Sequence, residues 1–111
     1  MAFSEKIDQL VTRLTILTES GKVAWEETAD ENLFLALVGA YVVTVGRVRI
    51  WDGPAEYVVR VEDAAGKMLD DVRRVEGPDF PRLEHLHEIA RRTALKVDNA
   101  LTDLLSSLDR V

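Results

Sequence analysis

The segment LFLALVGAYVVTV, residues 33 to 45, is the feature that most constrains what this 111-residue chain can fold into. Thr44 is its only side chain that strongly favours water. A membrane-spanning helix needs about 20 apolar residues, and this shorter run is interrupted by Gly39. Its second half is rich in valine, which favours extended chain. We therefore expect buried β-structure here rather than a membrane helix.

Residues 29 to 38 allow two interpretations. Thr28 to Glu31 matches a capping box, which would begin a helix that ends before Gly39. Alternatively, Leu33 to Val38 is a strand that turns through Gly39 and Ala40, since glycine at the first central position suits a type II′ hairpin. We prefer the strand because it gives the following strand a local partner.

The segment from Tyr41 to Trp51 is the clearest strand. Its apolar residues change phase at Gly46, with Tyr41, Val43 and Val45 on one parity and later apolar residues on the other. A β-bulge at Gly46 would restore one continuous apolar face.

Two more strands follow. Residues 57 to 61 alternate apolar and polar side chains, as in a half-buried strand. Asp63 to Gly66 is expected to close a hairpin to a return strand over residues 67 to 75. In that hairpin we expect Glu62 and Lys67 to face each other as a small favourable pair.

Apolar residues at helical spacing predict a helix at each end of the chain. Residues 3 to 18 carry one stripe, with Ser4 as the expected N-cap and Gly21 just beyond the last turn. Pro81 suits the first turn of the second helix. The stripe of that helix continues to the C-terminus through Leu83, Leu86, Ala90, Ala94, Val97, Leu101, Leu104 and Leu108. A helix of about 28 residues would be about 42 Å long.

This order of elements predicts a two-layer α+β fold, with residues 1–111 as a single domain. We expect an N-terminal helix, a four-stranded antiparallel β-meander and a long C-terminal helix, with the helices packed on one face of the sheet.

Composition narrows the functional classes. The chain has 20 acidic and 14 basic residues, and its net charge of -6 disfavours nucleic acid as a partner. It has no cysteine, which excludes disulfides, thiol catalysis and thiolate metal ligands. The first residues lack the basic and apolar regions of a secretory signal, so a cytoplasmic location is expected.

The two histidines, His85 and His87, are the first candidates for chemistry. Two residues apart on a helix, they point about 200° apart and do not grip one metal ion from the same face. Glu84 and Glu88 share a face, but a site there would need ligands from elsewhere. The pairs of adjacent acids along the chain are expected to be solvated charges. We expect no catalytic residue, no metal and no cofactor.

Five arginines lie in the expected strands: Arg47, Arg49, Arg60, Arg73 and Arg74. The first four are candidates for an anion-binding band on the open face of the sheet, where they could hold an acidic peptide, a phosphate or RNA. The alternative is cross-strand pairing with Glu62, Asp70 and Asp71. The negative net charge favours pairing.

The C-terminal leucines form a candidate interface. Leu101, Leu104, Leu105 and Leu108 are expected to extend beyond the sheet, where burying each leucine would contribute about 1.5–3 kcal/mol. Either the first helix covers them or another chain does. Because identical chains usually pair about a twofold axis, we expect a homodimer held mainly by helices, with the sheet face as the other possible contact.

Three segments together carry a resemblance: Gly21–Glu31, Asp63–Lys67 and Leu86–Arg92. Their order is similar to that in small bacterial proteins of helix–sheet–helix organisation, to which no function is assigned. The resemblance implies a bacterial cytoplasmic origin and carries over no site residue.

Three functional classes follow from these features. The first is a non-enzymatic module for protein–protein interaction or regulation, working as a homodimer. The second is binding of a small anionic ligand or nucleic acid on the arginine-bearing sheet. The third, with the least support, is an enzyme, because no nucleophile, base and orienting group come together in the sequence.

Overall fold

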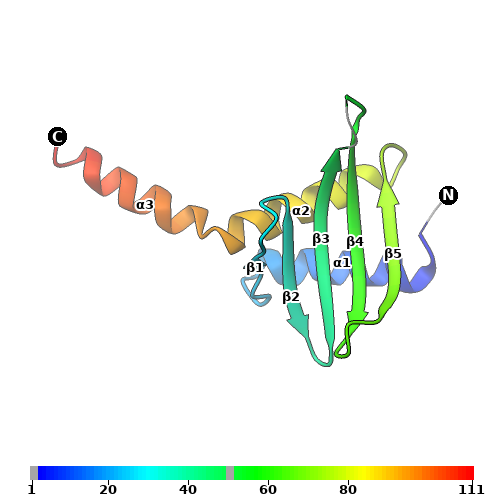
Figure 1. Cartoon of the computed structure of the whole chain (residues 1–111). Helices are drawn as coiled ribbons and strands as arrows, with labels where there is room; N and C mark the ends of the chain where they lie inside the picture. The colour runs from blue at the N-terminus through cyan, green and yellow to red at the C-terminus, as the bar shows by residue number, and fades with distance from the viewer. Residues whose placement is uncertain (1–2, 50–51) are drawn as a thin grey trace.

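The computed structural model describes residues 3–49 and 52–111, and these form an α+β fold of three helices and a five-stranded antiparallel sheet (Figure 1). Each strand pairs with the next in sequence, in the order β1-β2-β3-β4-β5. The helices are α1 (Glu5–Glu19), α2 (Phe80–Ala94) and α3 (Val97–Leu108). The strands are β1 (Glu26–Glu27), β2 (Leu33–Val38), β3 (Tyr41–Arg49), β4 (Ala55–Asp63) and β5 (Met68–Arg74). In the part of the chain that the structure describes, no helix combines the length and apolarity needed to cross a bilayer.

Helix α1 begins and ends where its capping residues predict. The Ser4 hydroxyl accepts a hydrogen bond of 3.2 Å from the amide of Ile7, which satisfies a free donor of the first turn. Beyond the last turn, Gly21 has a φ of 73° and the amide of Lys22 donates to the carbonyl of Leu17 at 2.9 Å. Both predictions are confirmed.

Residues 33 to 38 form a strand and not a helix. Val38 faces Tyr41 across a two-residue turn, and Gly39 has the positive φ of 60° that the turn requires. The Thr28 hydroxyl donates to the carbonyl of Leu33 at 2.9 Å. Thr28 therefore stabilises the loop before β2 instead of capping a helix.

The fifth strand is β1, which the sequence analysis did not predict. Glu26 faces Leu35 and Glu27 faces Phe34 across the edge of the sheet. Two residues are too few to show an alternating pattern, and both glutamates are exposed. Only the position of β2 beside this segment defines it as a strand.

The expected β-bulge at Gly46 is wrong. The pairs of β3 with β2 and β4 run through Gly46 without a shift, from Tyr41 to Arg49 on the β4 side. A Cβ at position 46 would collide with the side chain of Leu33 on the neighbouring strand. Glycine at position 46 leaves room for the Leu33 side chain. Because no bulge interrupts β3, the phase change puts apolar residues on both faces of the strand. Ile50 and Trp51, the end of the expected strand, lie outside the described residues.

The expected register of the β4–β5 hairpin is also wrong. Glu62 faces Met68, not Lys67, because the register shifts between Val61 and Glu62. The Asp63 carboxylate accepts a hydrogen bond of 2.9 Å from the amide of Lys67. That bond holds Lys67 in the loop and delays the start of β5.

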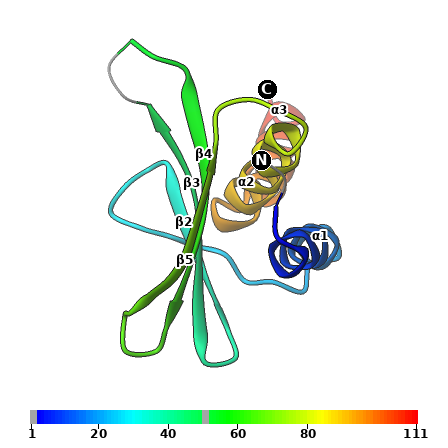
Figure 2. The same cartoon turned by 90° about the vertical axis from the view of Figure 1, so that its right-hand side faces the viewer.

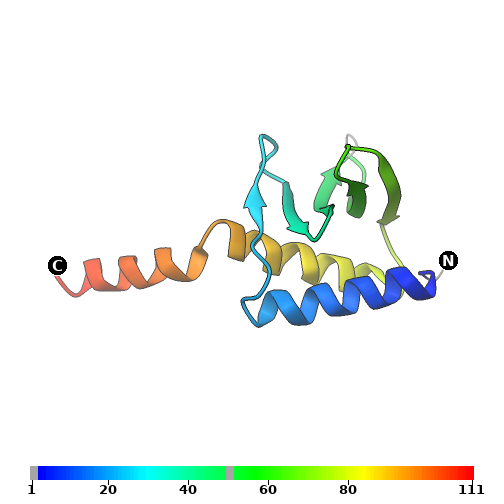
Figure 3. The same cartoon turned by 90° about the horizontal axis from the view of Figure 1, so that it is seen from below.

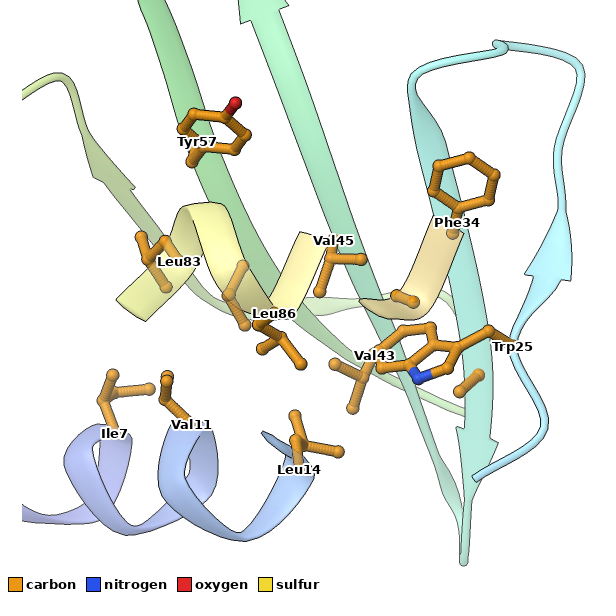
Figure 4. Packing of buried hydrophobic residues seen from close by; sticks show 13 residues of the cluster. Ile7, Val11, Leu14, Trp25, Phe34, Val43, Val45, Tyr57, Leu83 and Leu86 are labelled. Atoms are coloured by element: carbon orange, nitrogen blue, oxygen red, sulfur yellow. The ribbon is translucent and has the colours of Figure 1, made fainter. Parts of the chain in front are cut away.

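The core lies between the sheet and the two long helices. Figure 2 shows α1 and α2 on the same side of the sheet, and Figure 4 shows the side chains that meet there. The core cluster consists of Ile7, Val11, Leu14, Trp25, Phe34, Ala36, Val43, Val45, Tyr57, Val59, Leu83, Leu86 and Ala90. The Trp25 indole donates to the Thr18 hydroxyl at 2.9 Å, and this bond joins the end of α1 to the edge of the sheet.

The single long C-terminal helix is wrong as predicted, because the chain breaks between α2 and α3. Lys96 has φ 52° and ψ 46°, a left-handed conformation that ends the α2 geometry and redirects the chain. Neither glycine nor proline marks this break, so the two strongest stop signals are missing there; the basic residues Arg91 and Arg92 in the last turn of α2 are a weaker one. Helix α3 then extends away from the rest of the molecule (Figures 1 and 3).

Candidate interaction surfaces

Helix α3 carries an uncovered apolar stripe. Its leucines are 46% exposed at Leu101, 55% at Leu104, 63% at Leu105 and 58% at Leu108. Spacings of three and four residues place all four on one side of the helix. No residue of α3 is buried, and α1 packs against α2 rather than against α3. The sequence offered two covers for these leucines, the first helix or another chain, and in the structure α1 does not cover them.

The stripe has the spacing of a helix that packs against a partner. Val97, Leu101, Leu104, Leu108 and Val111 follow one another at alternating intervals of four and three residues, the heptad pattern of helix–helix seams. The opposite side of the helix is polar and consists of Asn99, Thr102, Asp103 and Ser106. Helix α3 is therefore amphipathic, and its four leucines are all exposed.

A second apolar surface lies on the side of the sheet away from α1 and α2. Side chains alternate between the two faces of a strand. Phe34 and Ala36 belong to the core, so Leu33, Leu35 and Leu37 point the other way. Across β3, Leu35 faces Thr44 and Leu37 faces Val42. We call the surface formed by Leu33, Leu35, Leu37 and Val42 the leucine face; Leu37 is 71% exposed there, and the other three side chains are half-buried.

The other half of the same sheet surface, on β4 and β5, is charged. Asp71 accepts hydrogen bonds from Arg73 at 2.8 Å and from Arg60 at 3.2 Å. Arg73 also reaches Glu56 at 3.2 Å. The hydrogen bond from Arg73, supported by that from Arg60, lowers the pKa of Asp71 against the opposing effect of its partial burial. The charged side chains of this half pair with one another, whereas neither α1 nor α2 covers the apolar side chains of the leucine face.

The four candidate anion-binding arginines do not come together. Arg47 and Arg49 share the parity of Val43 and Val45, since no bulge interrupts β3, and they lie on the helix side of the sheet. Arg60 and Arg73 lie on the opposite side. The cross-strand pairing that the sequence offered as the alternative is present, with Asp71 as the shared carboxylate.

The two histidines have separate surroundings. His87 is buried, with its ring 5.6 Å from that of Phe34 and 5.5 Å from that of Tyr57, and burial lowers its pKa. His85 is exposed, with Nε2 3.8 Å from a carboxylate oxygen of Glu19. Within residues 3–49 and 52–111, no cluster of three or more histidine or acidic side chains is suited to hold a metal ion.

An open hollow of about 410 Å³ lies beside α2. It is lined by Tyr57, Pro81, Glu84, His85, His87 and Glu88. His87 Nε2 is already bonded to the backbone carbonyl of Asn32 at 3.0 Å, so that nitrogen is engaged in the fold. The hollow therefore offers two carboxylates and an exposed imidazole, but His87 does not present a free Nε2 to it.

Leu33, Leu35 and Leu37 were not predicted as interaction residues from the sequence. The available signal was the run LFLALV, because an unbroken apolar strand is typical of a sheet covered on both faces. The helices cover only one face of this strand (Figure 2). Comparisons with protein families, with curated proteins and with solved structures found no match.

Proposed function

We propose that this protein is a non-enzymatic protein–protein interaction module that works as a homodimer, with α3 as the dimerisation element. The observation that carries the proposal is the exposed stripe Leu101, Leu104, Leu105 and Leu108. Each of these leucines is about half exposed, so covering the remainder would contribute roughly 1–2 kcal/mol per side chain. A monomer with this stripe in water would gain none of that free energy.

A second copy of the chain is the partner that the pattern favours. Heptad spacing suits packing against another regular element, and identical chains most often associate through a closed twofold arrangement. Asp103 lies on the side of α3 away from the stripe and stays in water when the stripe is covered. Asp98 borders the stripe in line with Leu105, and Arg92 pairs with it at 3.0 Å, so the charge nearest to the contact already has a partner.

The polar groups with catalytic potential have structural contacts, which supports a non-catalytic role. His87 joins α2 to the start of β2, and Arg60 and Arg73 hold Asp71. His87, Arg60 and Arg73 therefore have roles in the fold, which supports a non-catalytic function for these three residues. The cytoplasmic location expected from the sequence remains part of this proposal.

Light scattering over a range of protein concentrations tests the dimer. The expected result is twice the chain mass at high concentration, with dissociation on dilution. Leu104→Glu places a charge in the middle of the stripe and is expected to give a monomer. Ser106→Glu adds the same charge on the polar side of α3 and serves as the matched control, with the dimer retained.

Two results would contradict the proposal. One is a monomer at every concentration for the unmodified chain. The other is equal dissociation of Leu104→Glu and Ser106→Glu, which would show that charge on α3, rather than loss of the apolar stripe, controls association. Circular dichroism of each variant checks that the fold is intact. We expect it to be, because no residue of α3 is buried against the rest of the chain.

A further inference from the structure

The two uncovered apolar surfaces of one molecule match each other in kind and in length. One is the α3 stripe, on a helix of 12 residues that is about 18 Å long. The other is the leucine face, along a strand of six residues that is about 20 Å long. An amphipathic helix on an apolar sheet face is the packing that already forms the core on the other side.

Helix α3 has no path to the leucine face of its own chain. It follows α2, which packs on the opposite side of the sheet (Figures 1 and 2). Each packed layer lies about 10 Å from the next. A chain that passed from the helix layer, around β1 at the edge of the sheet, to a layer on the far side would therefore travel about 20 Å. The connection consists of Leu95 and Lys96 alone, and two residues span at most about 7 Å. The helix that covers the leucine face must come from another chain.

Pairing of α3 with α3 buries too little surface for a stable dimer. A helix 18 Å long and about 10 Å wide has a footprint of about 180 Å². With the flanks of the helix included, it loses roughly 300 Å² of accessible surface against one partner, or about 600 Å² in total for the pair. Stable interfaces bury at least about 1,200 Å². Two reciprocal contacts of α3 with a sheet reach about that total, and they cover both apolar surfaces instead of one.

We propose that the dimer forms by reciprocal exchange, with α3 of each copy packed across the leucine face of the other copy. The inference rests on the proposed homodimer and adds the surface that α3 binds. Leu101, Leu104 and Leu108 pack on Leu33, Leu35, Leu37 and Val42, and the two contacts are related by a twofold axis. The sheet is then covered on both sides along β2 and β3. The break at Lys96 sends α3 away from its own body and toward the second copy.

A substitution on the sheet, far from α3, tests the exchange. Thr44 lies in the middle of this surface, opposite Leu35 on one strand and Arg60 on the other. Thr44→Glu places a charge under the incoming helix, while Arg60 offers it a partner that keeps the single chain folded. The dimer dissociation constant is expected to rise about 100-fold or more, because the charge must be desolvated. Lys67→Glu in the β4–β5 loop is the control and leaves dimerisation unchanged.

A mixed-label experiment locates the bound α3 directly. The chain has no cysteine, so Ala100→Cys provides a single site for a nitroxide spin label beside the stripe. Spin-labelled chains are mixed with unmodified chains carrying ¹⁵N, and amide line broadening is read only on the latter. The expected broadening falls on residues 33 to 46.

These outcomes distinguish a failure of the α3 exchange from a failure of the homodimer. A dimer with broadening confined to residues 97 to 111 shows that α3 pairs with α3, which overturns the exchange and keeps the homodimer. A dimer with broadening elsewhere, or a dimer that Thr44→Glu leaves intact, also overturns the exchange. A monomer at all concentrations overturns both.

Discussion

His87 donates a hydrogen bond of 3.0 Å from Nε2 to the backbone carbonyl of Asn32, which joins α2 to the residue before β2. A carbonyl oxygen only accepts, so Nε2 carries the proton in the folded protein. The same carbonyl accepts from the amide of Arg47 at 3.1 Å. One oxygen thus links the helix layer, β2 and β3, and it holds the β2 strand that bears Leu33, Leu35 and Leu37.

The first prediction concerns pH and His87. Burial lowers its pKa below the ordinary value of 6.5, so the unfolded chain binds this proton more readily than the folded one. The contribution to stability is therefore complete above about pH 6.5 and is lost as pH falls toward the lowered folded pKa. Urea unfolding at pH 7.5 and at pH 5 should show a larger loss for the unmodified chain than for His87→Gln, which donates to Asn32 without titrating. Equal losses would show that His87 does not control this pH dependence.

The second prediction concerns the space at Gly46. Gly46→Ala should lower the free energy of unfolding by about 1–3 kcal/mol, because the added methyl group meets the side chain of Leu33. In the Leu33→Ala background the same substitution should cost much less. A double-mutant cycle measured by urea unfolding gives the coupling between the two positions. No coupling would mean that backbone freedom, and not contact with Leu33, requires the glycine.

The third prediction concerns the bond between Trp25 and Thr18. Both residues are 4% exposed, and the indole has the Thr18 hydroxyl as its acceptor at 2.9 Å. Thr18→Val keeps the shape but leaves a buried donor unsatisfied, which should cost about 1–3 kcal/mol. Thr15→Val in the same helix is the control and should cost less, because the Thr15 hydroxyl only adds a bond to a helical carbonyl. Equal costs in thermal unfolding would contradict a specific role for the indole bond.

The fourth prediction concerns the carboxylate shared by Arg60 and Arg73. Asp71→Asn should lower the free energy of unfolding at pH 7 by about 1 kcal/mol or less, since partly exposed ion pairs contribute little. The pKa of Asp71 lies below its ordinary value of 3.8, so its contribution is present above about pH 3.8 and is lost as pH falls further. The stability difference between the two proteins should therefore shrink as pH falls below 3.8 toward the lowered pKa of Asp71. Asp70→Asn is the neighbouring control; a cost equal to that of Asp71→Asn at pH 7 would rule out the shared ion pair as the cause.

Local signals in the sequence located most elements but not their relationships. Ser4 and Gly21 set the ends of α1, and Gly39 set the β2–β3 turn, because each acts through backbone contacts a few residues away. The phase change at Gly46 was visible, yet its cause was not. A bulge and a close contact with Leu33 give the same pattern along one strand, and only the neighbouring strand distinguishes them.

The arginines show the same limit for the candidate site. The prediction that Arg47 and Arg49 share a face with Arg60 and Arg73 was wrong. The face of each arginine depends on the register and on the absence of a bulge, and both are properties of paired strands. The exposed leucines of α3 were foreseen, since their surplus over what a short sheet needs follows from spacing alone. That α1 does not cover them depends on the left-handed conformation of Lys96, which a lysine in the sequence does not predict.

The sequence by itself determined that this protein has an apolar middle in strands between two amphipathic helical segments, because side-chain periodicity reports which faces avoid water. The tertiary structure alone decided where β1 pairs, on which face each arginine lies and that the C-terminal helix is two helices. Those features depend on strand register and on one left-handed residue, and their energies come from contacts between segments far apart in the chain. The uncovered leucines on α3 and on β2 become a matched pair of surfaces only once both are placed in space.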